Sequence, residues 1–243
     1  MKKKTTKYLL MLSFLVGMTL MSCQSNEAVA TQVQHEGVLR EIMMMGQLQA
    51  RADLKDYEQT PNLYALGAIE GLAGEILIIN GQPFNGKVMN EALMIQNDFE
   101  LKAALLVSSQ VETWDTLSID LEITDLNELQ TLIPTRLSQK PTEAFPFQIL
   151  GSEGSLNWHV INAPGASSQD HDAYKASGLS GSVSNEPVQI LGFYSENHEG
   201  IFTHHGSYLH MHFIDQKKQT MGHIDEFKWS GSMQLLIPKS LNP

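Results

Sequence analysis

Residues 207–227 read SYLHMHFIDQKKQTMGHIDEF and hold His210, His212 and His223, three of the nine histidines in the chain. His210 and His212 are two residues apart in an apolar stretch, so on a β-strand both side chains leave the same face, about 7 Å apart. A hairpin that turns at the Lys-Lys pair in its middle places His223 opposite His212 and diagonal to His210. Cross-strand neighbours lie about 5 Å apart and diagonal ones about 7 to 8 Å. The pattern therefore predicts three imidazoles converging on one face.

Three converging imidazoles suit a divalent metal, which binds each nitrogen at about 2.0–2.1 Å and keeps positions open for water or substrate. A shared tetrahedral ion needs the nitrogens within about 4 Å of one another, and the ligand type favours zinc over iron or nickel. The alternative is a polar hairpin that is rich in histidine by chance, since nine histidines in 243 residues give a His-x-His pair about one time in three. The third histidine in matching register favours a metal, because packed imidazoles otherwise need hydrogen-bond partners that the pattern does not supply.

The N-terminus, MKKKTTKYLLMLSFLVGMTLMSCQ, has four lysines, an apolar run from Tyr8 to Met21 and then Cys23, the single cysteine of the chain. This order predicts a signal peptide over residues 1–22, with an apolar run shorter than the about 20 residues that span a bilayer. The tetrapeptide Leu-Met-Ser-Cys that ends at Cys23 resembles the lipobox of bacterial lipoproteins, in which the cysteine becomes the lipidated first residue. We therefore expect an exported protein, lipid-anchored to the bacterial cell envelope. The alternative is a plain secretory signal with an incidental cysteine.

Composition limits the partners of the mature chain. With Cys23 used as an anchor no other cysteine remains, which excludes disulfides and thiolate chemistry. Removing four lysines and no acidic residue changes the formal charge from −11 to −15. Nucleic acid and anionic lipid would repel so acidic a domain, so the membrane contact we expect is the N-terminal lipid alone. Residues 24–34 after Cys23 are predicted to be a tether and residues 35–243 one globular domain, with a homodimer left open.

The remaining pattern predicts an α+β fold of mostly antiparallel or mixed β-sheet with a few helices, in two β-rich subdomains, with the histidine hairpin in the C-terminal half. Residues 35–52 are predicted to be helical, with Val38, Ile42, Met45 and Leu48 on an apolar face. A short helix over 124–133 and a long loop over 162–187 are also expected. Asn80-Gly81 indicates a type I′ turn. The expected strands cover residues 75–80, 88–95, 103–108, 117–123, 145–150, 156–161, 188–194, 207–214, 220–225 and 232–237.

Several segments together resemble the acetolactate decarboxylase family. LHMHF (209–213) and GHID (222–225) are similar to that family's His-x-His-Phe and Gly-Gly-His-Val segments. LGAIEGLAGEILIINGQPF (66–84) resembles the segment in which Gly-Thr-Phe leads to Leu-Asp-Gly-Glu, with Ala68 for the threonine and Ala73 for the aspartate. GFYSENHEGIFTHHGSY (192–208) resembles the lead-in to the hairpin, so the resemblance covers about 38–238.

This resemblance implies zinc on His210, His212 and His223 and an acid/base carboxylate at Glu75. From position alone, Glu75 could also be a solvated strand end. The implied activity is conversion of 2-acetolactate, a 2-hydroxy-3-keto acid, into acetoin, the reaction of acetoin biosynthesis. The metal stabilises the negative charge that develops as CO₂ leaves, and a carboxylic acid returns a proton to carbon. No organic cofactor is implied.

Two positions depart from the family. Its arginine falls at Asn162, which is therefore the predicted substrate-binding position, although asparagine lacks the planar fork of donors that arginine offers. The family also has a glutamate in a C-terminal extension, and here no acidic side chain follows Glu226. These departures leave two alternatives: a catalytically silent metal-binding homologue, or a metal-assisted reaction on a related 2-hydroxy-3-keto acid.

The other histidines receive weaker assignments. His204 and His205 are expected in a loop, where they are either solvated or close to the metal ligands. His159 has no partner that the sequence can name.

The lipid anchor can be tested at Cys23. We predict that Cys23→Ser leaves an unprocessed or soluble product, because the thiol that carries the lipid is gone; membrane fractionation with N-terminal mass spectrometry measures this. Wild-type protein found free in the culture fluid, without residues 1–22 and with an unmodified Cys23, contradicts the anchor.

Overall fold

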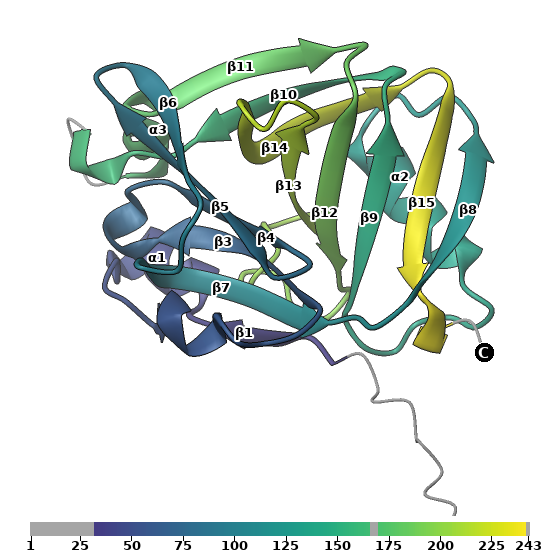
Figure 1. Cartoon of the computed structure of the whole chain (residues 1–243), viewed down its shortest axis with the longest axis horizontal. Coiled ribbons are helices and arrows are strands. Elements are labelled where there is room, and N and C mark those ends of the chain that lie inside the picture. Colours follow the sequence, from purple (N-terminus) through teal and green to yellow (C-terminus); the bar gives the residue numbers. More distant parts are fainter. Residues whose placement is uncertain (1–31, 166–169, 242–243) are drawn as a thin grey trace, which may run out of the picture.

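Two antiparallel β-sheets pack face to face in the computed structural model, which describes residues 32–165 and 170–241 (Figure 1). The first sheet has the order β1-β7-β3-β4-β5-β6, with β2 also paired to β7. Its strands are β1 (Gln34–Glu36), β2 (Ala52–Asp53), β3 (Leu63–Ile69), β4 (Glu75–Ile79), β5 (Gln82–Met89), β6 (Ala92–Gln96) and β7 (Lys102–Gln110).

The second sheet has the order β11-β10-β14-β13-β12-β9-β15-β8. Its strands are β8 (Trp114–Asp120), β9 (Phe145–Gly151), β10 (Gly154–Val160), β11 (Leu179–Ser184), β12 (Val188–Tyr194), β13 (Leu209–Asp215), β14 (Met221–Trp229) and β15 (Ser232–Pro238). The helices are α1 (Leu39–Met45), α2 (Leu126–Leu132) and α3 (His171–Ala176), with 3-10 turns η1 (Leu54–Tyr57), η2 (Glu70–Leu72), η3 (Ile133–Arg136), η4 (Ala163–Gly165) and η5 (Lys239–Leu241). The two-sheet α+β architecture agrees with the predicted fold class.

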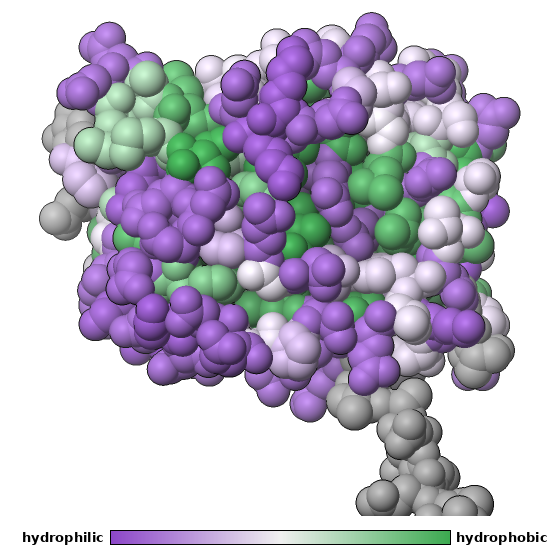
Figure 2. Space-filling view, in the orientation of Figure 1, coloured by the Kyte–Doolittle hydropathy of each residue, from purple (hydrophilic) through white to green (hydrophobic). Residues whose placement is uncertain are grey.

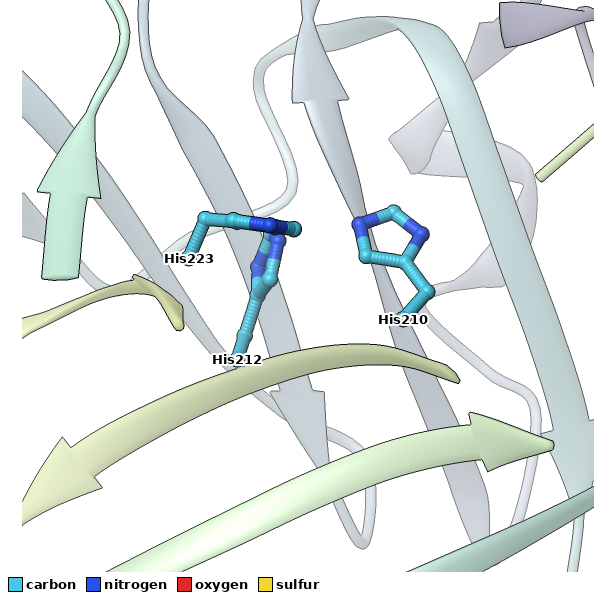
Figure 3. Close-up of side chains that lie close together, drawn as sticks. All are labelled: His210, His212 and His223. Carbon is cyan, nitrogen blue, oxygen red and sulfur yellow. The ribbon is translucent and has the colours of Figure 1, made fainter. Parts of the chain in front are cut away.

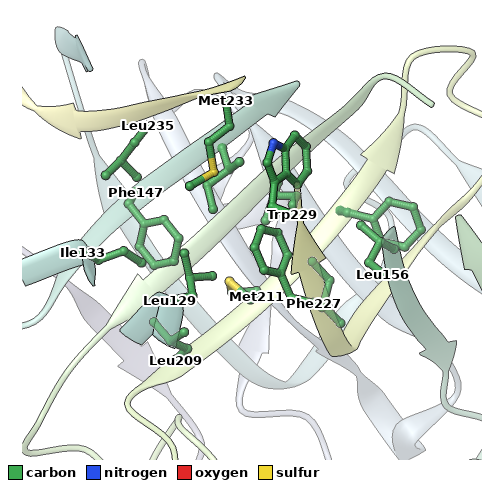
Figure 4. Close-up of a cluster of buried hydrophobic side chains, with 14 of the residues drawn as sticks. Leu129, Ile133, Phe147, Leu156, Leu209, Met211, Phe227, Trp229, Met233 and Leu235 are labelled. Carbon is green, nitrogen blue, oxygen red and sulfur yellow. The ribbon is translucent and has the colours of Figure 1, made fainter. Parts of the chain in front are cut away.

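Strand β13 lies in the middle of the second sheet, and all seven of its residues are buried. Because successive side chains of a strand point to opposite faces, its two sides have different surroundings. Leu209, Met211 and Phe213 join a core that also contains Leu129 of α2 and Phe147 of β9 (Figure 4). On the other face, His210 and His212 point toward the first sheet. The alternation of the sequence thus places both imidazoles between the sheets.

A shared apolar core holds the two sheets together. It combines Leu66 and Leu77 of the first sheet with Leu191 and Phe193 of the second. Burying each such side chain contributes roughly 1.5–3 kcal/mol. The site described below therefore lies in a buried interface between the sheets.

Turn chemistry in the sequence predicted the hairpins correctly. Asn80 and Gly81 have φ values of 49° and 76°, as both central residues of a type I′ turn require. In the histidine hairpin His212 pairs directly with His223, the predicted register. Asn90 and Glu91, with φ values of 52° and 63°, form a second turn of this kind that was not predicted. It splits the expected strand 88–95 between β5 and β6.

Other expectations need correction. The helix expected over 35–52 shrinks to α1, because Gly46 adopts the left-handed conformation (φ 62°) that ends a helix. Met45, expected on the apolar face, is 67% exposed. The expected loop 162–187 contains α3 and β11, and strand β3 was not predicted. The tether assigned to 24–34 ends earlier, because Gln34 already pairs with Ser108 of β7.

The predicted signal peptide, Cys23 and most of the tether lie outside the described residues. In the part of the chain that the structure describes, no helix has the length and hydropathy needed to cross a membrane. The face in Figure 2 is mostly hydrophilic, with small scattered apolar areas.

Candidate metal centre

His210, His212 and His223 converge between the sheets (Figure 3). Strand β13 supplies the first two and β14 supplies the third, with His223 directly opposite His212. One ring nitrogen from each lies within 4.8 Å of the others, slightly wider than the about 4 Å expected for a shared tetrahedral ion. All three side chains are buried, and the structure brings the predicted triad together.

The hydrogen bonds of the triad fit a metal. His212 Nδ1 donates to the carbonyl oxygen of Ile76 at 2.8 Å, which fixes the ring and leaves its buried Nε2 without a partner among the described residues. His210 Nδ1 is likewise buried and unpartnered there. Buried polar atoms nearly always have partners, and a second hydrogen bond that orients the ring is typical of metal-binding histidines. These nitrogens are therefore suited to bind a cation.

Burial also keeps the triad in its metal-binding protonation state. It lowers the pKa of His212 from 6.5 to about 3, and the pKa values of His210 and His223 well below 6.5. Neighbouring imidazoles act in the same direction, because each opposes a second positive charge. All three rings are neutral near pH 7, so no proton has to leave before a metal binds.

Glu75 faces the triad from the first sheet, at the start of β4. It is 4% exposed, so it is not a solvated strand end. Its Oε2 lies 3.6 Å from His212 Nε2, and its Oε1 accepts a hydrogen bond from the backbone N–H of Ile161 at 3.2 Å. Burial raises the pKa of Glu75 to about 7, against the opposing effects of His159 and the Ile161 N–H. This carboxyl can therefore hold or release a proton near neutral pH.

His159 is a site residue that the sequence analysis did not identify. It lies on β10 directly opposite His223, with its ring centroid 5.0 Å from that of His223. Its Nε2 is 3.9 Å from Glu75 Oε1. The pairing of β10 with β14 joins segments more than sixty residues apart, so no local pattern indicated it.

Asp225 and Lys175 fix the orientation of His159. Both carboxylate oxygens of Asp225 lie 3.0 Å from His159 Nδ1, and Lys175 Nζ lies 2.7 Å from Asp225 Oδ1. Burial raises the pKa of Asp225, but the hydrogen bonds from His159 and Lys175 outweigh this effect and hold the pKa below its ordinary value. An ionised Asp225 accepts a hydrogen bond from Nδ1–H of His159, and this directs Nε2 of His159 toward Glu75.

Asn162 does not contact the triad. Its side-chain amide donates to the carbonyl oxygen of Ser177 at 3.2 Å, and the Ser177 hydroxyl donates to the Asn162 carbonyl oxygen. Asn162 thus ties the end of β10 to the end of α3. Its predicted role in substrate binding stays a prediction.

A cavity of about 40 Å³ lies against the triad. Its polar wall comprises Glu75, His159, His204, His210 and His223, and its apolar wall comprises Leu39, Ile42, Met43, Gly67, Ala68, Leu72, Leu105 and Ile161. Helix α1 therefore covers the site with apolar side chains. Among the described residues that line the cavity there is no arginine or lysine.

Residues 37–239 match the family model described as alpha-acetolactate decarboxylase. No curated protein sequence matches the chain.

Three crystal structures share the fold. The alpha-acetolactate decarboxylase of Bacillus subtilis strain 168 is 16% identical, with a TM-score of 0.67 and 85% of each chain covered. The acetolactate decarboxylase of Bacillus subtilis subspecies spizizenii is 17% identical, with a TM-score of 0.65 and 85% of each chain covered. A Staphylococcus aureus protein of unknown function, similar to alpha-acetolactate decarboxylase, is 14% identical, with a TM-score of 0.65 and 84% of each chain covered. At these identities the likeness concerns the fold.

The raised pKa of Glu75 predicts a pH-dependent stability of the metal-free protein. The folded state binds the Glu75 proton more tightly than the unfolded state, so this stabilisation is complete below pH 4.5 and is lost as pH rises through about 7. The difference between 4.5 and about 7 corresponds to about 3 kcal/mol.

Glu75→Gln removes this contribution and leaves the histidines in place. Both proteins are unfolded in urea with a chelator present, at pH 5 and at pH 8. From pH 5 to pH 8, the free energy of unfolding of wild type should fall by about 3 kcal/mol more than that of Glu75→Gln. If the free energies of unfolding of the two proteins differ by the same amount at pH 5 and at pH 8, Glu75 is not a buried, neutral carboxyl.

Proposed function

Because the chain belongs to the alpha-acetolactate decarboxylase family, we propose that it is a zinc-dependent carbon–carbon lyase that converts 2-acetolactate into acetoin and CO₂. The observation that carries this proposal is the buried triad of His210, His212 and His223 with Glu75 on the facing sheet. In this reaction the bond to the carboxylate carbon breaks, the electron pair stays on the remaining carbon, and that carbon takes up a proton.

The triad and Glu75 have different roles in this proposal: the triad binds the metal, and Glu75 carries the proton. The three imidazoles would hold a divalent ion, which would supply a Lewis acid for the negative charge that develops on the substrate as CO₂ leaves. Glu75 holds the proton that is delivered to carbon, and burial favours its neutral acid form. The apolar side chains of Leu72 and Leu105 keep water from competing for the developing carbanion.

His159 is the group best placed to bind the substrate's oxygen atoms. It lines the cavity, its ring is oriented by Asp225, and it lies on the same strand that leads to Asn162. A doubly protonated His159, with its Nδ1–H bonded to Asp225, would donate from Nε2 and take over part of the work of the family's arginine. This assignment fits the lack of arginine and lysine among the described residues of the cavity wall.

A second candidate is a metal-binding homologue without turnover. The observation that favours it is the lack of arginine and lysine among the described residues of the cavity wall, which leaves no fixed cation for a substrate carboxylate. The acetoin assay below distinguishes the two candidates, because both predict that the metal binds.

Glu75→Gln tests the proton carrier. With zinc and racemic acetolactate, wild type should produce acetoin and Glu75→Gln should lose at least about 100-fold in rate, the lower range for general acid catalysis. Zinc content should stay unchanged, because Glu75 lies outside the group of mutually close ligand atoms. Glu112→Gln, an exposed site, is the control.

The outcomes of that assay distinguish an enzyme from a silent homologue, and a proton carrier from a metal ligand. Wild type that makes no acetoin above the background with zinc alone supports the silent homologue. An active wild type whose Glu75→Gln variant loses zinc shows that Glu75 is a ligand and that its proposed role is wrong.

His159→Phe tests the substrate contact. Phenylalanine keeps a ring but removes the Nε2 donor, so KM should rise by about ten- to a hundredfold, the equivalent of one charge-assisted hydrogen bond. Zinc content should not change. Asn162→Ala is the comparison, and its KM should stay close to that of wild type because its side chain bonds Ser177. A KM that rises in Asn162→Ala and not in His159→Phe reverses the two roles.

A further inference from the structure

His204 adds a fourth imidazole to the wall of the cavity. It lies in the segment between β12 and β13 and is partly buried. Its ring centroid is 5.0 Å from that of His223 and 6.1 Å from that of His210. It therefore approaches the triad from the loop that precedes β13.

These spacings resemble those within the triad. The centroids of His210, His212 and His223 are 5.1, 5.2 and 5.4 Å apart. His204 thus has a ligand-like distance to His223 and a slightly longer one to His210. In the structure His204 lies outside the group of mutually close ligand atoms, so its side chain has to move toward His210 to bring four imidazoles around one point.

The loop orients His204 and the next residue, His205, in different directions. His205, the next residue, is fully turned to solvent and pairs with Glu199. Glu199 also accepts a hydrogen bond from the backbone N–H of Gly206 at 3.0 Å, and Thr203 is fully buried. Of two consecutive histidines, the loop directs one to the cavity and the other away from it.

We propose that His204 is a fourth, exchangeable ligand of the metal held by His210, His212 and His223. The inference rests on the metal site proposed above, and not on the reaction. Three protein ligands with an open position are typical of catalytic zinc, whereas four protein ligands close the coordination sphere. With His204 bound, the ion is held more tightly and shielded from water. A substrate oxygen that binds the ion then has to displace the imidazole of His204.

Cobalt(II) in place of zinc tests this ligand without any assay of activity. Four-coordinate cobalt(II) absorbs visible light more strongly than five- or six-coordinate cobalt(II). His204→Ala should shift and weaken the visible bands of the cobalt protein, because water replaces the imidazole and the opened position admits a fifth ligand. It should also raise the dissociation constant for zinc, measured by chelator competition, by at least about 10-fold. His205→Ala is the matched control and should change neither quantity.

Free imidazole provides the rescue. Alanine leaves room for it, so millimolar imidazole should restore the visible bands of cobalt-loaded His204→Ala, and this recovery also shows that the variant is folded. Equal spectra and equal zinc affinities for wild type and His204→Ala overturn the fourth ligand. Wild type that binds no cobalt or zinc overturns the metal site itself. Tight metal binding that depends on His204, without acetoin production, upholds this inference and counts against the proposed reaction.

Discussion

The hydrogen bond from His212 Nδ1 to the carbonyl oxygen of Ile76 connects the two sheets at the place where the site forms. It sets the direction of the Nε2 atom of His212, and with it the point on which the triad converges. It also sets the position of β4 relative to β13. Glu75, the residue before Ile76, therefore lies with its Oε2 3.6 Å from His212 Nε2. The Glu75 carboxylate adds a second polar link, to the backbone of Ile161. The rest of the site is built around these two contacts.

This arrangement also sets the electrostatics of the site. Burial favours neutral histidines and a neutral Glu75, so the metal-free cavity carries little charge. The charge of Asp225 is matched by Lys175 on the outer side of His159. A divalent cation entering the cavity therefore gains most from the imidazole lone pairs. Desolvation of the empty ligands is a cost to folding, and metal binding offsets it.

Local chemistry explains what could be predicted from the sequence. The histidine hairpin was predictable because strand alternation and a short turn fix its register within the fourteen residues from His210 to His223. The turn at Asn80-Gly81 was predictable because it needs two positive φ angles. His159 was not predictable, since its position depends on the pairing of β10 with β14, a contact between distant segments. The extent of helix α1 was overestimated because an apolar period continued past Gly46, where the backbone turns left-handed. Asn162 was expected at the position of the family's arginine, and its orientation depends on α3, which had been expected as loop.

The central claim is that one divalent metal binds to the triad between the two sheets. A crystal structure of zinc-loaded protein, with diffraction data collected on both sides of the zinc absorption edge, tests it most directly. The account predicts a single strong anomalous peak about 2.0–2.1 Å from one ring nitrogen of each of His210, His212 and His223. A zinc peak elsewhere in the molecule, or a zinc-soaked crystal in which these three imidazoles surround no anomalous peak, would contradict it.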